Sequence, residues 1–325
     1  MCIALLSTEH PDYPFILLNI RDEFLNRPTL PADWWDDPNE HVLGGRDLQR
    51  PARGTWLGIT RQGRFAVLTN FREEGAEVTK DKSRGAMINA YLTSPPDSHE
   101  QPRTFATRLI NDIGIHDVGG FSLLFGRLQA PKDGRLPGLS VLSNRSASAD
   151  SLPNIATTPN ETHGLSNSHF GDATWPKVVE GEQLLREAIQ KSLKSGSSQI
   201  DFIESLFDIL SISKLREREP DEDWNVYVRQ MRNSILIPPV RSAADAETKT
   251  AARVGANVNG TSTPDHGNVR VTDAGYGTQK QTVILVDKTG HVRFVERTLF
   301  DEDGRSVKRE HGEKVLEFEI EGWLE

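Results

Sequence analysis

The only cysteine in this chain of 325 residues is Cys2, which directly follows Met1. Removal of Met1 would place a free α-amino group on the same residue as the thiol. A thiol is a weak nucleophile until a base takes its proton, and an α-amine with an ordinary pKa of about 7.7–8.0 can do this near neutral pH. Cys2 therefore predicts either a nucleophile that carries its own base or a buried, inert thiol at the start of an N-terminal strand.

The composition is typical of a globular protein with an apolar core, at 36% hydrophobic and 26% charged residues. The formal net charge is −9, and the densest basic stretch, residues 305–314, is interrupted by Glu310 and Glu313. This pattern argues against a nucleic-acid partner, which would require a basic patch. A single cysteine excludes an internal disulfide and a multi-thiolate metal site, and it fits a reducing compartment.

The chain has no apolar run that approaches the about 18 residues of a membrane-spanning helix. Residues 2–6 are apolar but too few for the hydrophobic core of a secretory signal. We therefore expect the mature chain to begin at residue 1 or 2. We also expect a cytoplasmic protein without a transmembrane segment, which associates only transiently with organelle membranes such as those of the Golgi or mitochondria.

Apolar runs at the start of the chain predict two buried strands. Residues 2–7 and 14–21 are almost continuously hydrophobic, which favours central strands that are buried on both faces. Further strands are expected at 56–60 and 65–70. Residues 31–54, rich in Pro, Trp, Gly and charge, instead predict a long ordered loop.

The later elements are mainly helices and then strands. Helical spacing of apolar residues predicts four helices, at 83–92, 103–111, 176–195 and 199–210. Apolar runs and turn signals predict further strands at 121–128, 139–144, 282–286, 291–297 and 315–320, the last as an outer strand. This order predicts a layered α+β fold in which N- and C-terminal strands share sheets.

We expect residues 1–325 to form a single domain with one surface insertion. The stretch 241–273 is rich in Ala, Thr, Asn, Gly and Asp and has no apolar period. Such a composition predicts a flexible segment that the fold does not need.

A series of motifs gives the chain a family resemblance. Residues 19–29 read Asn-Ile-Arg-Asp-Glu-Phe-Leu-Asn-Arg-Pro-Thr, and they are considered together with Met1-Cys2-Ile3 at the start of the chain. Further blocks follow in order: Gly54–Ile59, Leu68–Asn70, Ser83–Gly85, Gly164–Asn167, Thr174–Lys177, Tyr276–Thr278, Ile284–Asp287 and Glu296–Arg297. Taken together, these blocks resemble the NRDE family, named after its Asn-Arg-Asp-Glu motif, whose eukaryotic branch is the transport-and-Golgi-organisation group.

The NRDE family is similar to N-terminal-nucleophile hydrolases, particularly the cysteine amidases that cleave bile-salt and penicillin V amides. The resemblance implies a four-layer α-β-β-α sandwich with the nucleophile at the start of a central strand. The order of the predicted elements accommodates this fold.

The resemblance also implies a set of site residues around Cys2. The matching arginine, Arg21, would lie beside the thiol and favour its thiolate, and the matching aspartate, Asp22, would orient the α-amine. Asn70 and Asn167 match the asparagines that steady the oxyanion and the amine. The residues themselves also allow other roles: Arg21 could form a structural ion pair with Asp22 or Glu23, and both asparagines could be turn residues.

Two positions depart from the family pattern. Ile20 stands where the family usually has Asn, and the nearest amide is one residue earlier, at Asn19. A shift of one residue in a strand places that amide on the opposite face. Gln279 follows Tyr-Gly-Thr, where the family commonly has an arginine, and it cannot supply that charge.

Three functions remain open from the sequence. The resemblance implies a role in Golgi organisation and secretion and in haem or acyl-lipid handling, with Cys2 at the base of a pocket for a small-molecule or lipid-like ligand. Haem or acyl-CoA would be a ligand, and no cofactor or metal is required. The alternative is a cysteine hydrolase of linear amides that works through an acyl-Cys2 intermediate, so the sequence leaves enzymatic status undecided. A scaffold with a vestigial pocket is the third.

Overall fold

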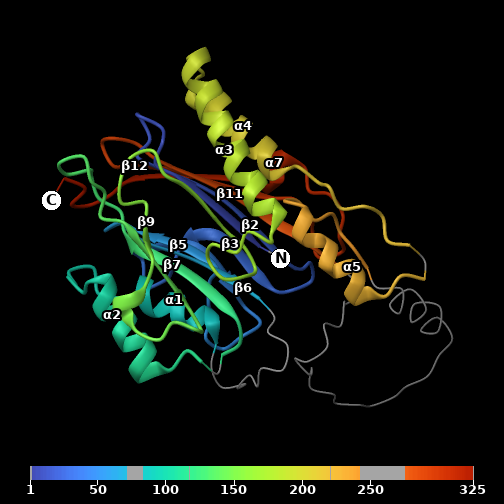
Figure 1. Ribbon diagram of the computed structural model, residues 1–325, viewed down its shortest axis with the longest axis horizontal. Helices are drawn as coiled ribbons and strands as arrows, with labels where there is room; N and C mark the ends of the chain where they lie inside the picture. The colour runs from blue at the N-terminus through green and yellow to red at the C-terminus, as the bar shows by residue number, and fades with distance from the viewer. Residues whose placement is uncertain (1, 72–82, 117, 220, 242–274, 325) are drawn as a thin grey trace.

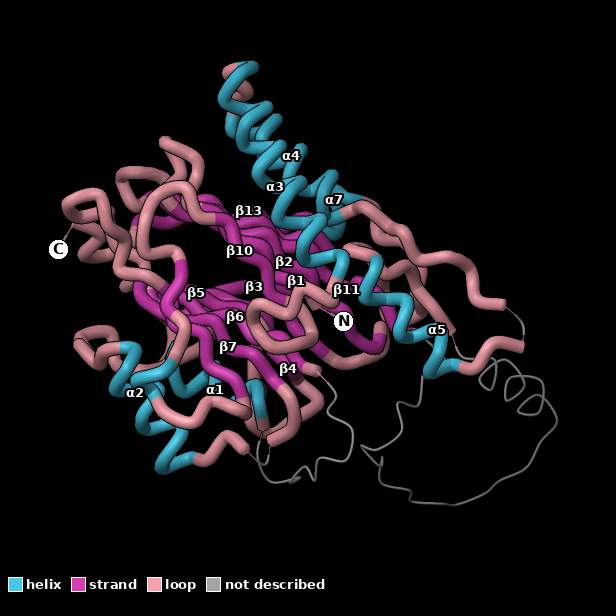
Figure 2. The backbone as a smooth tube through the Cα atoms, viewed as in Figure 1, coloured by secondary structure: helices cyan, strands magenta, loops and turns pink. Residues whose placement is uncertain are grey.

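The computed structural model describes residues 2–71, 83–116, 118–219, 221–241 and 275–324. Within these ranges two antiparallel sheets are stacked face to face, and helices cover the outer face of each sheet (Figures 1 and 2). One outer layer contains α3 (Pro176–Ser195) and α4 (Gln199–Leu210), and the opposite layer contains α1 (Arg84–Leu92) and α2 (Pro102–Arg108). This order of layers confirms the predicted α-β-β-α sandwich.

The first sheet combines strands from both ends of the chain, as predicted. Its order is β10-β1-β2-β11-β12-β13, which are Thr162–Leu165, Ile3–Ser7, Phe15–Phe24, Tyr276–Val286, His291–Thr298 and Glu313–Glu319. The continuously apolar β1 and β2 are central and are buried along almost their whole length. The predicted outer strand, β13, lies at one edge.

The second sheet contains a correction to the sequence analysis. Its order is β3-β4-β5-β6-β7-β8-β9, which are Thr29–Trp34, Val42–Asp47, Leu57–Thr60, Arg64–Asn70, Phe121–Arg127, Leu139–Ser143 and Asn154–Ile155. The predicted loop at 31–54 is wrong, because it contains most of β3 and all of β4. Pro31 falls where the β3–β4 register shifts, and an edge strand tolerates a residue that has no amide hydrogen.

Three apolar layers hold the four structural layers together. Leu17 and Phe65 belong to the cluster between the two sheets. Ile3 and Leu185 belong to the cluster between the first sheet and α3 with α4, whereas α1 and α2 pack on the second sheet through a third cluster. Each element therefore buries apolar side chains against a neighbouring layer.

The remaining elements are short. They are α5 (Trp224–Gln230), α7 (Arg309–Gly312) and the helical turns η1 (Leu109–Ile113), η2 (Ala149–Ser151) and η3 (Met231–Asn233). The predicted insertion at 241–273 lies, apart from Arg241, outside the described residues. Within the described ranges, no helix is both long enough and apolar enough to span a membrane.

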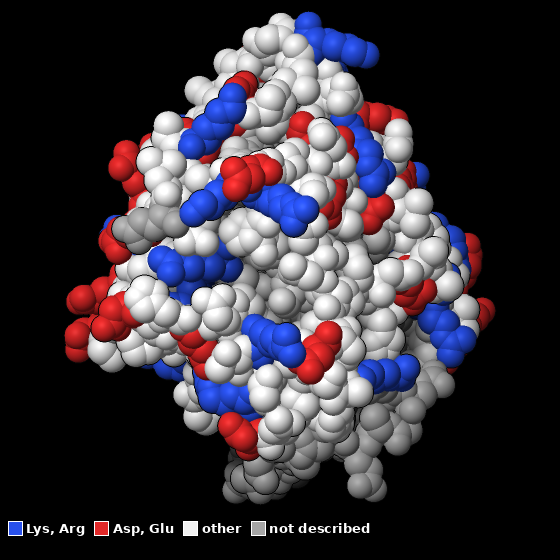
Figure 3. Space-filling view, turned by 60° about the vertical axis from the view of Figure 1, so that its left-hand side comes forward, with Lys and Arg blue, Asp and Glu red and all other residues white. Residues whose placement is uncertain are grey.

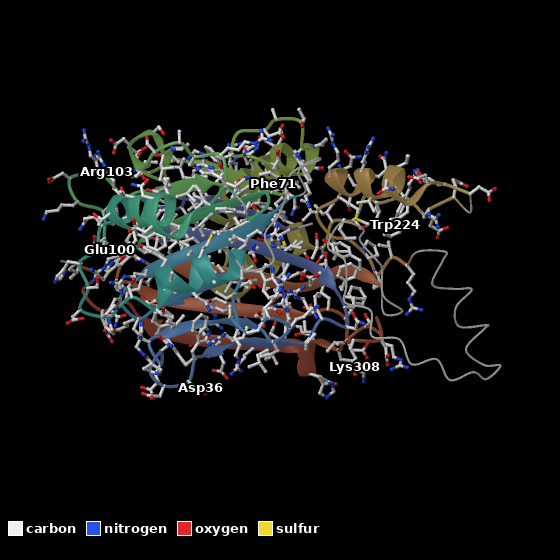
Figure 4. The ribbon with its side chains drawn as sticks, turned by 90° about the horizontal axis from the view of Figure 1, so that it is seen from below. Asp36, Phe71, Glu100, Arg103, Trp224 and Lys308 are labelled. Atoms are coloured by element: carbon white, nitrogen blue, oxygen red, sulfur yellow. The ribbon has the colours of Figure 1, made fainter. Side chains whose placement is uncertain are left out.

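Figure 4 shows the molecule from below. Glu100, just before α2, and Arg103 of α2 lie at one end, Trp224 of α5 lies at the other, and Phe71, which follows β6, lies between them. On the face shown in Figure 3, acidic and basic side chains are interspersed around uncharged surface.

Several strand ends meet at one end of the sandwich. Because β1 pairs antiparallel with β2 and β10, its first residues lie beside the last residues of both neighbours. The start of β11 lies beside the end of β2 for the same reason. Figures 1 and 2 mark the N-terminus at this end of the sandwich.

Close packing of α3 on β1 depends on a glycine. Gly181 is buried on the face of α3 that contacts β1, and a Cβ added to it would lie 2.7 Å from Cδ1 of Leu5. Leu5 is itself fully buried, so it has little room to move away. The absence of a side chain at 181 therefore fixes how near α3 lies to the start of β1.

We expect Gly181→Val to destabilise the fold by about 2–3 kcal/mol, because the added atoms overpack the α3–β1 contact. Gln183→Val is the matched control, since it adds valine on the exposed face of the same helix. Its effect should stay within about 1 kcal/mol. Urea unfolding followed by circular dichroism measures both, and equal losses would contradict the packing argument.

Candidate active site around Cys2

Cys2 lies immediately before β1 and is 5% exposed. Its Sγ lies 3.8 Å from the backbone oxygen of Asp22, to which the thiol donates, and its own carbonyl oxygen accepts a hydrogen bond of 2.7 Å from Ser166 Oγ. Burial raises the pKa of the thiol above its usual value, and the nearby carboxylate of Asp22 acts in the same direction. Hydrogen bonds therefore hold Cys2 in place, and burial disfavours the thiolate form of its sulfur.

Arg21 lies on the same side of the sheet as Cys2. The antiparallel register pairs Ile3 with Ile20, which places Cys2 opposite Arg21. The Arg21 guanidinium lies 4.8 Å from the centre of the Trp56 ring. Burial lowers the pKa of Arg21, and Glu296 is the largest opposing influence.

Arg21 is hydrogen-bonded only to neutral acceptors among the described residues. Its Nη2 donates to Thr29 Oγ1 at 3.1 Å and to Gln279 Oε1, and its buried Nε has no partner in the described part of the chain. Within those residues no carboxylate lies within ion-pair distance of Arg21, and the pair with Glu23 is made by Arg27 instead, at 3.6 Å. The sequence alternative of a structural ion pair at Arg21 is therefore wrong.

Gln279 reaches Arg21 because β11 is irregular at this point. Thr278 pairs with Asp22 and Lys280 pairs with Arg21, so Gln279 is an extra residue on β11. A β-bulge of this kind turns a side chain away from the regular alternation. In this conformation Gln279 Oε1 accepts a hydrogen bond from Arg21, and Gln279 Nε2 donates a hydrogen bond of 3.3 Å to Leu25 O. It thus supplies a neutral oxygen at the position where the family commonly has a cation.

Asp22, the next residue along β2, is 4% exposed and points to the opposite side of the sheet from Arg21. Its Oδ1 accepts a hydrogen bond of 2.6 Å from Thr278 Oγ1. The Tyr276 hydroxyl donates to the Asp22 backbone oxygen at 3.4 Å. Burial raises the pKa of Tyr276 well above its usual value, and the charges of Asp22 and Cys2 add to the shift. Tyr276 is therefore a neutral hydroxyl beside the site.

Asn70 and Asn167 connect the two sheets near Cys2. Asn70 is the last residue of β6, and Asn167 follows β10 by two residues. Asn167 Nδ2 donates to the backbone oxygen of Asn70, and its Oδ1 accepts from Ser166 Oγ at 3.3 Å. Asn70 Oδ1 is buried and has no hydrogen-bond partner among the described residues. The structure thus brings both asparagines to the end of the sandwich where Cys2 lies.

The amide at Asn19 does not substitute for the missing motif asparagine. Asn19 Nδ2 donates to Ile3 O at 2.9 Å, whereas Ile20 packs in the apolar layer under α3 and α4. The two side chains lie on opposite faces of β2, as the one-residue shift predicts.

Lys177 is a site residue that the sequence analysis did not identify. It lies in the first turn of α3 and is 0% exposed. Burial lowers the pKa of its amine, and the charges of Asp22 and Cys2 oppose that shift. The signal in the sequence was its place in the block Thr174–Lys177, together with its spacing of four from Gly181 and eight from Leu185 on one helix face.

The arrangement has the parts that nucleophilic chemistry requires. It has one thiol, a buried guanidinium with no carboxylate at ion-pair distance in the described part of the chain, a buried carboxylate and amine, and two amides that can donate to a developing oxyanion. The described residues contain no group of three or more His, Cys, Asp or Glu side chains placed to hold a metal ion.

The lowered pKa of Lys177 predicts a pH effect on stability. In the unfolded chain the amine titrates near 10.5, whereas in the folded chain it loses its proton at a lower pH. Between those two values the unfolded state binds more protons, so stability rises with pH. The difference in unfolding free energy between wild type and Lys177→Met should therefore shift in favour of wild type as the pH rises toward 10.5. Denaturant unfolding at several pH values measures it, and a constant difference would contradict the shift.

Comparison with solved structures identifies proteins of low similarity. Among solved structures, the chain is similar to a Caenorhabditis elegans N-acylethanolamine-hydrolyzing acid amidase ortholog, with 15% identity and a TM-score of 0.43 over 70% of this chain and 97% of that chain. It is also similar to a penicillin V acylase from Agrobacterium tumefaciens, with 13% identity and a TM-score of 0.35 over 95% of this chain and 98% of that one. Sequence identities and TM-scores this low do not indicate that this chain shares the activity of either protein.

Sequence comparison identifies relatives along most of the chain. The human Transport and Golgi organization protein 2 homolog is 30% identical, and the Mus musculus homolog is 29% identical. Each match covers 90% of this chain and 88% of the relative. The family model described as Transport and Golgi organisation 2 matches residues 1–301. The chain therefore belongs to the Transport and Golgi organisation 2 family.

Proposed function

We propose that this chain is a cysteine hydrolase that cleaves a linear amide through an acyl-Cys2 intermediate. The observation that carries the proposal is the buried Arg21 beside Cys2, which has no carboxylate partner among the described residues. An unpaired buried cation destabilises a folded protein by several kcal/mol, in the range of about 3–5. A developing thiolate or oxyanion at Cys2 would supply the negative charge that Arg21 lacks.

The proposed reaction has two steps. In the first, the α-amine that removal of Met1 exposes takes the proton of the Cys2 thiol, and the sulfur attacks the amide carbonyl carbon. The C–N bond breaks as the C–S bond forms, and the leaving nitrogen takes the proton. In the second, water attacks the thioester, which releases the carboxylic acid and restores the thiol.

The surrounding residues have separate roles in this scheme. Arg21 favours the thiolate, and Asp22 orients the α-amine. Asn70 and Asn167 donate to the oxyanion and hold the amine, and the hydrogen bond from Asn167 Nδ2 to the backbone oxygen of Asn70 holds the two residues together.

A second candidate is a carrier that binds a lipid-like ligand without turnover. The raised pKa of the Cys2 thiol favours it, because burial opposes formation of the nucleophile. Gln279 favours it too, since it keeps Arg21 engaged with a neutral amide. Such a carrier would hold an acyl lipid, acyl-CoA or haem beside Cys2.

The cellular role is proposed from the relatives. The names of the human and mouse homologs refer to transport and Golgi organization. We propose a role in Golgi organisation and protein secretion, and we further propose that the chain acts in the cytoplasm with acyl lipids or haem as its ligands.

The test is acylation of Cys2 by a long-chain acyl β-lactone, followed by intact-mass measurement. We expect one acyl group on wild type, none on Cys2→Ala, and a loss of amide turnover of about 10³-fold or more in that variant. Molecules that retain Met1 in the same sample are an internal control and should stay unmodified. If Cys2→Ala keeps its turnover, the hydrolase proposal is wrong. If no acyl group forms and Cys2→Ala still binds acyl-CoA, the carrier is supported instead.

A further inference from the structure

The buried stripe of α3 begins with a lysine. Lys177, Gly181, Leu185 and Ile189 recur at four-residue spacing and are all buried. Leu185 and Ile189 pack in the apolar layer over the first sheet, and Gly181 lies against Leu5 of β1. Lys177 continues the same stripe by one turn toward the N-terminus of the helix, over the end of the sheet where Cys2 and Asp22 lie.

This position is unfavourable for a cation in two ways. The side chain is 0% exposed, so its amine has lost the hydration of bulk water. It also lies in the first turn of a 20-residue helix, directly after Pro176, where the helix dipole repels positive charge. A methionine of similar length would fill the same space without either penalty. The ammonium therefore needs negative charge nearby.

The charged groups around Lys177 come from several elements. Asp22 of β2 and Cys2, just before β1, are groups whose charge acts on its amine. Tyr276 of β11 lies beside Asp22 through its hydroxyl. Arg232 of η3 donates to Thr174 O just before α3, and the Trp175 ring centre lies 5.9 Å from the Lys177 amine. Among the described residues, Asp22 and Cys2 of the proposed site are thus groups whose negative charge favours the Lys177 ammonium.

We propose that Lys177 is a positioning residue for Cys2, whose buried ammonium stabilises the Asp22 carboxylate and the Cys2 thiolate and so sets the pH range in which Cys2 reacts. The inference rests on the proposed function, since a reactive Cys2 is what Lys177 would serve. Lys177 thus gives α3 a role in the chemistry of Cys2, as a positive charge that the motif residues on the strands do not provide. No proton leaves the thiol to Lys177 in this scheme, because the lysine acts only through its charge.

The pH dependence of Cys2 alkylation by iodoacetamide tests this proposal directly. Cys2 is the only cysteine, so the intact mass reports on that thiol alone. We expect Lys177→Met to move the midpoint of the rate profile upward by about one pH unit, which lowers the rate near neutral pH about tenfold. A midpoint equal to that of wild type, or below it, would overturn the proposal.

Two further variants keep the test decisive. Asp22→Asn removes a charge that raises the pKa of the thiol, so its midpoint should fall. Lys177→Met/Asp22→Asn buries neither charge, and its midpoint should lie above that of Asp22→Asn. If Lys177→Met alone does not fold, the test is the comparison of the double variant with Asp22→Asn. Equal midpoints in these two variants would reject the role of Lys177.

The matched control is Ile189→Ala, which weakens the same stripe of α3 without changing a charge. The pH midpoint of Cys2 alkylation in this variant should equal that of wild type, even though the protein is less stable. An upward shift of the midpoint would show that the packing of α3, and not the charge of Lys177, sets the pH dependence of alkylation. Alkylation needs no substrate, so this result is independent of amide turnover. Loss of the acyl-Cys2 adduct with an intact Lys177 effect would reject the hydrolase and keep the positioning role.

Discussion

The burial of charge beside Cys2 is the constraint on which the rest of the structure depends. Arg21, Asp22 and Lys177 are each at most 5% exposed, and all three surround one thiol. Removing ions from water costs several kcal/mol for each group unless nearby charges and hydrogen bonds compensate. A fold that needed only stability would fill these positions with apolar side chains. The buried charges at this end of the sandwich lower the stability of the fold, and the apolar side chains buried in the three layers offset that loss.

The site uses both faces of one sheet. Arg21 and Cys2 face the second sheet, whereas Asp22 lies on the side of α3 and Lys177. The adjacent residues Arg21 and Asp22 can both be buried on opposite faces of β2 only if another layer packs on each face of the sheet. This explains why β1 and β2 are central strands. The glycine at 181 then allows α3 to approach closely enough to bring Lys177 over the ends of these strands. The four-layer architecture is therefore a requirement of the site.

Sequence reasoning identified the features that local patterns determine. The continuous apolar runs at 2–7 and 14–21 predicted central strands, and the alternation at 315–320 predicted an edge. The four-layer order and the site residues on the strands came from the family motifs. The loop predicted at 31–54 was wrong, because pairing on a sheet edge holds β3 and β4 despite Pro31 and the charges around it.

The features that were missed depend on contacts between distant segments. The burial of Lys177 results from the packing of Gly181 on Leu5, which helical spacing alone does not reveal. The contact between Gln279 and Arg21 requires a bulge in β11, and its sequence carries no clear signal of one. Asn70 and Asn167 lie 97 residues apart and meet only because the two sheets stack.

The central claim is that the charges beside Cys2 are kept for chemistry at the expense of stability. The most direct test compares the unfolding free energies of Arg21→Met and Arg27→Met. Arg27 donates to both carboxylate oxygens of Asp47, so its loss should cost about 2 kcal/mol or more. Arg21 has no such partner among the described residues, and Arg21→Met should stay within about 1 kcal/mol of wild type or exceed it. An equal loss in both variants would show that Arg21 is held for stability and would contradict the claim.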